Sequence, residues 1–367
     1  MAFFNDFFSL LWYYHIMKKI VKLLIDNGYD AYIVGGYVRD YLLGIDSKDI
    51  DICTNASIKD IKKIFGSTGQ SYDEYYSYHI KKDNKNFDIT SYRKELSYKK
   101  NKPNCIKPAK TLKEDLLRRD FTINTFAISS DGKLIDLLNA KADLNSKLIK
   151  VVGDTNKKLK EDRTRIIRAL RFMCCLDFDL HPDILKFLKN NHSNLLVDVP
   201  LDYIKMELDK IFDSNNYGRF FYILKRYSLY DSFNIKCTHD INKTYNRYGI
   251  WSQLETTLPL SKKENKIIKN INLLLDKNDI NFNDVCNYSD DVIYNAAYIL
   301  GIESKVKTLK ELKSMQSIID IDISIDVLLK YVKIENIKHV YKNINENIIS
   351  GKLNNDEESI IKYLRSL

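Results

Sequence analysis

Two different hydrophobic periods divide the chain into two parts. Between residue 31 and about residue 136, short β-rich runs alternate with short helical runs. We expect strands over residues 31–34, 50–53, 78–81 and 87–92, and helices over residues 38–43, 58–65 and 122–128. From residue 143 onward, apolar residues recur at helical spacing, most clearly over residues 159–172, 182–189, 201–212, 218–227, 262–275 and 289–300. The pattern predicts an α+β fold, with a small mixed sheet in the head and only helices after it.

Composition narrows the class of protein without identifying it. The chain has 367 residues, 44% of them hydrophobic, and a formal charge of +9, which permits nucleic-acid binding but does not require it. Its six cysteines show neither C-x-x-C pairs nor zinc-like spacing, so we expect reduced thiols and a cytoplasmic location. No run approaches the roughly 20 apolar residues that cross a bilayer, so no membrane partner is expected.

A glycine pair follows the first expected strand. Gly35 and Gly36 let the backbone approach a bulky group, and the next helix begins with free amide donors for phosphate. Arg39 adds a fork-shaped donor within the first turn of that helix.

Two aspartates lie on the second expected strand. Asp49 and Asp51 are two residues apart, so their carboxylates point to one face, where they repel each other unless a cation lies between them. A polar, solvated strand face is the simpler interpretation, but Ile50 and Ile52 indicate that the opposite face is buried. Asp88, on a neighbouring strand, is the candidate third catalytic acid, and it could equally be a surface residue.

Three ordered motifs resemble one family. The run 34–44 with Asp49-Ile50-Asp51 is similar to the first motif of the class II tRNA nucleotidyltransferases (CCA-adding enzymes) and bacterial poly(A) polymerases. Residues 118–124 resemble the second motif, and residues 161–172 resemble the motif that selects the base. One departure is that Asp136 is followed by Leu137, where the family often has a glycine pair, although Asp143 is retained.

The resemblance implies roles for named residues. Asp49 and Asp51 would hold Mg²⁺, with two ions expected. The nucleotide would be bound by Gly35, Gly36, Arg39, Arg119, Asp120, Asn124, Asp162, Arg165, Arg168 and Arg171. Within this set, Gly36 and Arg39 would contact the triphosphate, while Arg119 and Asp120 would address the ribose and phosphates.

The base-selecting motif has a chemical rationale. On a continuous helix, Asp162 and Arg165 share one face, with Arg168 nearby. A carboxylate only accepts hydrogen bonds and a guanidinium only donates them, so the pair complements the amine and ring nitrogen of cytosine or adenine and mismatches uracil and guanine. The alternative is that Glu161 and Arg165 form an ordinary surface salt bridge.

The resemblance also implies a domain order. We expect an N-terminal extension at residues 1–16, a catalytic nucleotidyltransferase head at 17–145, a helical neck that recognises the base at 146–212, a helical body at 213–275 and a tRNA-binding tail at 276–367. The extension could be a docking helix or a translated upstream stretch, because Met17 precedes two lysines in the manner of a start.

Residues 93–119 bear on the product. They hold ten Lys or Arg against three Asp or Glu, which indicates a solvated loop or a segment that helps to hold the nucleotide and the RNA end. The resemblance implies a flexible loop here, as in CCA-adding relatives. That loop and Ser67-Thr68-Gly69 favour addition of all three nucleotides.

The expected function is template-independent addition of C, C and A to the 3′ end of tRNA from CTP and ATP. A poly(A) polymerase, or an enzyme that adds only CC or only A, is the close alternative. An inactive RNA-binding protein and a nucleotidyltransferase acting on a small molecule are the more distant ones. Protein partners are not indicated.

Overall fold

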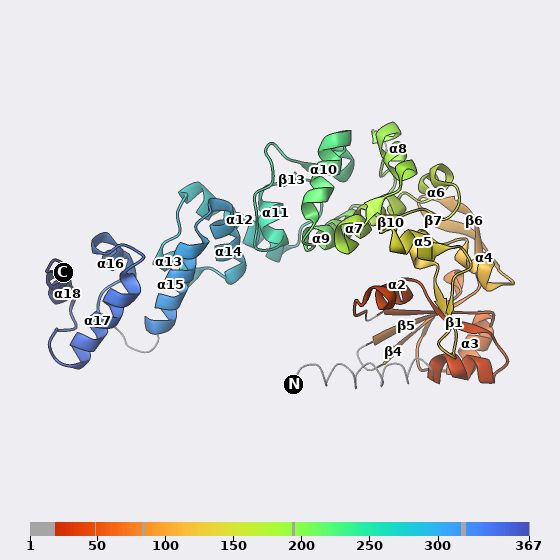
Figure 1. Ribbon diagram of the computed structural model, residues 1–367, viewed down its shortest axis with the longest axis horizontal. Coiled ribbons are helices and arrows are strands. Elements are labelled where there is room, and N and C mark those ends of the chain that lie inside the picture. Colours follow the sequence, from red (N-terminus) through yellow and green to blue (C-terminus); the bar gives the residue numbers. More distant parts are fainter. Residues whose placement is uncertain (1–18, 48, 83–84, 193–194, 317–320, 367) are drawn as a thin grey trace. The chain divides into compact units, whose positions relative to one another are not determined.

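The computed structural model describes residues 19–366 except residues 48, 83–84, 193–194 and 317–320 (Figure 1). The predicted extension at residues 1–16 therefore lies outside the described residues. The chain divides into two compact units, Met1–Ser232 and Phe233–Leu367. This division falls inside the predicted body, and the finer division into head, neck, body and tail stays a prediction.

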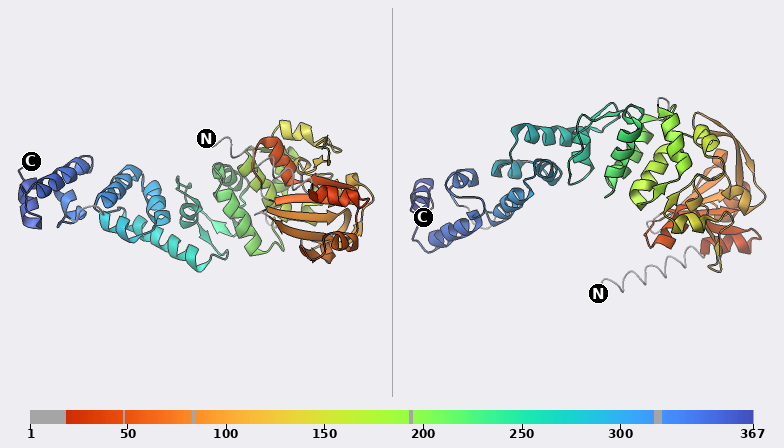
Figure 2. Two further views of the ribbon diagram at one scale, coloured as in Figure 1. Left: turned by 90° about the horizontal axis from the view of Figure 1, so that it is seen from below. Right: turned by 45° about the horizontal axis from the view of Figure 1, so that its top comes forward.

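The first unit is built on a seven-stranded mixed sheet (Figure 2). The strand order is β3-β4-β5-β2-β1-β8-β9, with β2 and β5 parallel and the other neighbours antiparallel. The strands are β1 (Ala31–Val34), β2 (Asp49–Thr54), β3 (Gln70–Tyr72), β4 (Ser77–Lys82), β5 (Lys85–Ser91), β8 (Ala127–Ile128) and β9 (Leu134–Ile135). The four strands expected from the sequence are all present.

The two faces of this sheet differ in polarity. Ile50, Ile52 and Ile89 are at most 1% exposed and point to one face. Helix α3 (Ile58–Phe65) covers this face, where its Phe65 stacks on Tyr78 with 6.1 Å between ring centroids. The alternation of side chains along each strand places the aspartates of β2 on the opposite face. Part of that face is also covered, by a second cluster of Val34, Cys53, Tyr92, Leu116 and Ala127. The sequence pattern thus fixes which face can carry chemistry.

Residues 93–119 form ordered structure, so the prediction of a loop was wrong. β6 (Arg93–Lys99) and β7 (Lys102–Pro108) pair as an antiparallel hairpin, followed by α4 (Leu112–Leu116). The turn residues Lys100 and Asn101 have φ values of 49° and 61°, the left-handed conformation that a tight hairpin turn requires. Asn101 also accepts a hydrogen bond from the Arg163 amide at 2.9 Å and so anchors the hairpin tip. Lysine-rich strands hid the alternating pattern in the sequence.

Residues 122–128 do not form the expected helix. A short 3₁₀ turn, η2 (Thr122–Asn124), leads directly into β8, where Ala127 pairs with Val34. Pairing with the central strand β1 overrides the helical spacing of these apolar residues. A further 3₁₀ turn, η1 (Asp73–Tyr75), joins β3 to β4.

The turn after Asp136, where the sequence departs from the expected glycine pair, contains an asparagine in the left-handed conformation. Asn139 has a φ of 56°, a conformation that asparagine tolerates better than most residues. The Asp136 carboxylate accepts hydrogen bonds from the amides of Ala140 (2.8 Å) and Lys141 (2.9 Å), which satisfies the first turn of α5 (Ala140–Asn145). The departure from the family pattern therefore leaves the turn intact.

Helices complete the first unit, and one of them is interrupted. The predicted helix over residues 159–172 is wrong because the chain leaves helical geometry at Asp162, where φ is −140° and ψ is 99°. The Asp162 carboxylate accepts from the Thr164 amide at 3.0 Å and so caps the following helix. The elements are α6 (Thr155–Glu161), α7 (Thr164–Leu176), α8 (Pro182–Asn190), α9 (Leu201–Phe212) and α10 (Tyr217–Tyr227), with the short pair β10 (Leu148–Ile149) and β11 (Asp179–Leu180) and the turn η4 (Tyr230–Phe233).

The second unit is almost entirely helical. Its elements are β12 (Ile235–Lys236), α11 (Arg247–Ser252), β13 (Glu255–Thr256), α12 (Lys262–Lys277), α13 (Phe282–Asn287), α14 (Asp290–Leu300), α15 (Glu303–Gln316), α16 (Ile325–Tyr331), α17 (Ile337–Ile349) and α18 (Glu357–Leu364). The fully buried Asn295 accepts from the amides of Tyr245 and Asn246 at 3.0 and 3.1 Å, so the chain entering α11 is fastened to α14. Among the described helices, none combines the length and the apolar character that a membrane crossing needs.

Candidate active site

The turn after β1 brings two charged groups together. Gly35 has a φ of 79°, and a Cβ at this position would lie 2.6 Å from Asp51 Oδ2 and 2.8 Å from Arg119 Nη1. Only glycine fits, both for its backbone angle and for the space. Helix α2 (Gly36–Leu43) begins at the next residue and carries Arg39.

Asp49 and Asp51 share one face of β2 and offer hard oxygen ligands. Asp49 Oδ1 accepts a hydrogen bond from Asn86 Nδ2 at 2.8 Å, which orients its carboxylate. Burial raises the pKa of Asp51, and the Arg119 guanidinium acts against that rise. A divalent cation would hold Asp51 ionised, so this pair fits Mg²⁺, which commonly takes one or two protein carboxylates and completes its shell with phosphate and water.

Asp88 lies beside Asp51 but is engaged elsewhere. The two residues are direct partners in the parallel pairing of β2 with β5. His79 Nδ1, from β4, forms an ion pair with Asp88 Oδ1. In the described part of the chain, no three His, Cys, Asp or Glu side chains converge closely enough to hold a metal ion. A catalytic role for Asp88 stays a prediction.

A cavity of about 270 Å³ gathers most of the predicted site. Ten predicted residues line it: Gly35, Gly36, Arg39, Asp49, Asp51, Arg119, Asp120, Asn124, Arg168 and Arg171. Tyr37, Asp40, Ser47 and Phe172 complete the lining. Asp88, Asp162 and Arg165 are not among the lining residues.

Hydrogen bonds fix the polar groups at one end of this cavity. Arg39 donates to Asp40 Oδ1 from Nε (2.9 Å) and Nη2 (2.6 Å) and to Asn124 Oδ1 from Nη1 (2.7 Å). Asn124 Nδ2 in turn donates to Asp120 Oδ1 at 3.0 Å, and Arg168 holds Asp120 Oδ2. Burial acts to raise the pKa of Asp120, but Arg168 and Asn124 outweigh it and hold that pKa below its usual range.

Phe172 and Glu207 support the arginines of α7 and were missed as site residues. The Phe172 ring lies 4.7, 5.7 and 4.1 Å from the guanidinium carbons of Arg39, Arg168 and Arg171, distances at which cations are attracted to an aromatic face. Glu207, on α9 and 1% exposed, accepts from Arg171 Nε at 2.6 Å. Phe172 could have been recognised from its place beside Arg171. Glu207 lies 36 residues further along the chain, and no local signal points to it.

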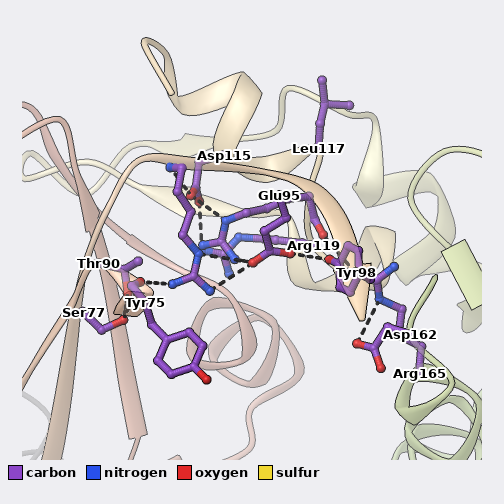
Figure 3. A network of polar contacts seen from close by, with 12 residues as sticks. Tyr75, Ser77, Thr90, Glu95, Tyr98, Asp115, Leu117, Arg119, Asp162 and Arg165 are labelled. Carbon is purple, nitrogen blue, oxygen red and sulfur yellow. Dashed lines mark hydrogen bonds and ion pairs between the residues drawn. The ribbon is translucent and has the colours of Figure 1, made fainter. Parts of the chain in front are cut away.

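Arg119 is held by one carboxylate and has an unused donor. Fully buried Asp115 accepts from Arg118 Nε at 2.9 Å and from Arg119 Nη2 at 3.5 Å (Figure 3). Arg119 Nε is buried and has no hydrogen-bond partner among the described residues. Arg119 also lines the cavity, and a buried donor without a partner calls for one, which an anionic ligand could supply.

Asp162 and Arg165 lie together beside the hairpin rather than in the cavity. Arg165 Nε is 3.7 Å from Asp162 Oδ2, while its Nη2 donates to the Tyr98 hydroxyl at 2.8 Å. Figure 3 shows Tyr98 between Glu95 and Arg165, and Tyr98 donates a hydrogen bond to Glu95. The alternative pairing of Glu161 with Arg165 is not found, and Glu161 pairs with Lys157 at 3.9 Å. Hence the pair exists, although the continuous helix that suggested it does not.

Comparisons with known proteins concern the sequence family and the fold. Residues 31–150 match the family described as the poly(A) polymerase head domain. The CCA-adding enzyme of Pediococcus pentosaceus is 36% identical over 195 residues, 53% of this chain and 49% of the relative, so the chain spans about half the length of that relative. The CCA-adding enzyme of Staphylococcus aureus is 26% identical over 388 residues, and the match covers 95% of this chain and 96% of that enzyme.

A solved structure shows the same fold. The Bacillus stearothermophilus CCA-adding enzyme in complex with CTP superposes with a TM-score of 0.61 at 21% identity, covering 95% of this chain and 96% of that one. The resemblance carried by the three motifs is thereby confirmed: residues 31–150 match the poly(A) polymerase head domain, and the chain is similar in sequence to CCA-adding enzymes.

Proposed function

We propose that this protein adds C, C and A to the 3′ end of tRNA, using CTP and ATP and no nucleic-acid template. The observation that carries the proposal is one cavity whose lining includes both Asp49 and Asp51 and the arginines Arg119, Arg168 and Arg171. Nucleotidyl transfer needs this combination, because acidic groups must hold cations beside a triphosphate that cationic groups also bind. The names of the relatives supply the choice of polymer.

Asp49 and Asp51 would hold two Mg²⁺ ions together with phosphate oxygens and water. When bound, the ions would lower the pKa of the attacking hydroxyl and neutralise the charge that develops on the phosphates. The chain's own contribution is to orient the two carboxylates: Asn86 fixes Asp49, and Gly35 leaves room for Asp51.

The arginines would bind the triphosphate and ribose. Arg119 has its free Nε donor, and Glu207 and Asp120 hold Arg171 and Arg168 in place before the ligand arrives. Such preorganisation lowers the entropic cost of binding a flexible triphosphate. Arg39 already donates hydrogen bonds to Asp40 and Asn124. Its first role would therefore be to orient these two cavity residues, and its second would be to contact the triphosphate.

Asp162 and Arg165 would select the base. Their 3.7 Å separation leaves the carboxylate and guanidinium close enough to face the Watson–Crick edge of one base. Burial raises the pKa of Asp162, so pairing with a base amine would also stabilise its ionised form.

The tRNA acceptor and the cytoplasmic location are inferred from the helical second unit, the net charge and the cysteines. The helical second unit would grip the tRNA backbone, and the +9 charge of the chain favours that contact. The cysteines of the described chain are free, as is typical of a cytoplasmic protein.

Labelled nucleotides provide the test. Purified protein is incubated with tRNA lacking its 3′ end and with labelled CTP, ATP, or both. With CTP alone we expect the addition of two C residues. With CTP and ATP together we expect one A to follow the two C residues, and the RNA should gain no more than three nucleotides. Long A tracts on any RNA would show a poly(A) polymerase, and arrest after CC would show a CC-adding enzyme. Asp51→Asn is the inactive control.

A further inference from the structure

A second cavity opens on the polar face of the sheet. It has a volume of about 400 Å³, within the range of about 300–1,000 Å³ that small-molecule sites occupy. Its lining comes from β3, β4, β5 and the turn before β3: Ser67, Thr68, Gly69, Gln70, His79, Ile80, Lys81, Asn86 and Asp88. None of its polar residues has a role in the nucleotide site described above except Asp88 and Asn86.

Strand register places this cavity directly beside the first one. Asp51 is paired with Asp88 across β2 and β5, and Asp88 is paired with His79 across β5 and β4. Paired residues point to the same face of a sheet, so these three side chains form one row. Asp51 lines the first cavity and Asp88 lines the second. The two cavities therefore have neighbouring carboxylates in their walls, at the edge where the reaction is proposed to occur.

The two cavities differ in charge. The first is lined by four arginines, Arg39, Arg119, Arg168 and Arg171, and suits a triphosphate. The second offers hydroxyl, amide and imidazole groups with Lys81 as its one Lys or Arg lining residue. That set suits a nucleoside bearing a single phosphate.

His79 supplies a platform for a base. Asp88 holds its Nδ1, and the Tyr72 ring meets the imidazole edge-on with 4.7 Å between centroids. Both contacts fix the ring, while 44% of the side chain remains exposed. Unpaired RNA bases stack on fixed aromatic side chains of this kind.

We propose that the second cavity binds the 3′-terminal nucleotide of the RNA acceptor, with its base on His79 and its ribose toward Asp88 and Asp51. This inference rests on the proposed function, because it names the place of the second substrate. It makes the reaction geometry complete: the triphosphate enters from the arginine side, and the attacking hydroxyl enters from the His79 side.

Two substitutions of His79 separate stacking from a purely structural role. His79→Asn keeps a polar partner for Asp88 but removes the aromatic ring, whereas His79→Phe keeps a ring and removes the partner. We expect His79→Asn to raise the KM for tRNA by about tenfold, the size of one lost stacking contact, and to leave the KM for CTP unchanged. His79→Phe should keep the KM for tRNA within about twofold of the wild-type value. His239→Ala is the control for loss of an exposed histidine, and thermal unfolding checks that all variants fold.

The opposite result would overturn the inference. If His79→Asn is normal and only His79→Phe is impaired in kcat, then His79 merely holds Asp88. A raised KM for CTP in either variant would place the incoming nucleotide in this cavity and would also overturn the inference.

Photo-crosslinking locates the RNA end without relying on activity. A tRNA ending in 4-thiouridine is irradiated with the full-length protein, and the crosslinked peptide is identified by mass spectrometry. Crosslinks within residues 67–81 support the cavity, and crosslinks confined to α2 or α7 contradict it. Wild-type protein that adds nothing to any RNA would refute the proposed function itself, whereas activity without these crosslinks refutes only the acceptor cavity.

Discussion

Arg168 donates two hydrogen bonds to one oxygen of Asp120, from Nε at 3.0 Å and from Nη2 at 2.5 Å. Asp120 follows α4 in the sheet-bearing part of the first unit, and Arg168 lies in the middle of α7. The pair therefore joins the second sequence motif to the base-selecting motif. Because Asp120 also accepts from Asn124 at 3.0 Å, one carboxylate orders two sides of the cavity.

Asp120→Asn should lower stability in a pH-dependent way. The pKa of Asp120 in the folded protein lies below its value of about 3.9 in the unfolded chain. The ionised carboxylate therefore stabilises the folded state fully when the pH is above the unfolded-state pKa. This stabilisation is lost as the pH falls through the folded-state pKa. Breaking this partly buried pair should cost about 2–3 kcal/mol near pH 7. Urea unfolding of wild type and variant near pH 7 and near pH 3 measures both effects.

The surface pair Lys22–Asp26 is the matched control for that measurement. It has a similar length of 2.7 Å but side chains that are 69% and 53% exposed. Asp26→Asn should therefore change the free energy of unfolding by less than about 0.5 kcal/mol. A difference between wild type and Asp120→Asn that persists undiminished at low pH would contradict the assignment of an ionised Asp120.

Asp49→Ala and Asp51→Ala should each abolish addition of every nucleotide. Either change removes an oxygen ligand of the proposed ions, and the expected loss in kcat is about 10³-fold or more. Binding of tRNA, measured by fluorescence anisotropy, should be nearly unchanged because phosphate contacts elsewhere dominate affinity. The exposed turn residue Asp131, changed to alanine, is the control. Full activity in either variant would leave the two-metal proposal without ligands.

Sequence reasoning located the elements whose cues are local. β1 and α3 were predicted with the bounds Ala31–Val34 and Ile58–Phe65 that the structure has. The capping box of Ser57 and Asp60 and the amphipathic pattern that follows it both indicate α3. Where such local signals agree with the tertiary fold, little information is missing from the sequence.

Two kinds of feature could not be predicted in this way: a local side-chain contact that competes with a helix, and contacts between residues far apart in the chain. The break at Asp162 arises because the side chain caps Thr164, which competes with continuing the helix. The β6–β7 hairpin is anchored by Asn101 on Arg163, 62 residues away, so no local pattern signals it. Motif recognition named ten residues of the first cavity, but it could not foresee that Glu207 supports Arg171 or that Tyr98 holds Arg165.

Gly35→Ala should inactivate the protein through geometry rather than through unfolding. The backbone strain of an alanine at φ 79° should cost about 1–2 kcal/mol. The new Cβ would also lie 2.6 Å from Asp51 Oδ2, so the carboxylate must move out of place. Gly44→Ala provides a close control, because φ is 71° there and no atom lies within 4 Å of a Cβ. We expect Gly35→Ala to lose more stability than Gly44→Ala in thermal unfolding, because Gly35 has a ψ of −144°, outside the left-handed helical region that Gly44 adopts. Only Gly35→Ala should lose nucleotide addition. Equal activity in the two variants would show that the Asp51 position tolerates displacement.

Asp162→Ala should relax the choice of nucleotide. Without the carboxylate, the acceptor for the exocyclic amine of C or A is lost, and the penalty against U and G falls with it. The cost of such a lost pairing, about 1–3 kcal/mol, predicts a rise of about tenfold or more in UTP and GTP incorporation relative to CTP. Because Asp162 also caps α7, Asp154→Ala is the matched control: Asp154 caps α6 by accepting from the Lys157 amide at 2.7 Å and is not a partner of Arg165. Competition assays with all four triphosphates on tRNA lacking its 3′ end give the ratios. Unchanged ratios in Asp162→Ala, or equal relaxation in Asp154→Ala, would mean that the base is read by other groups.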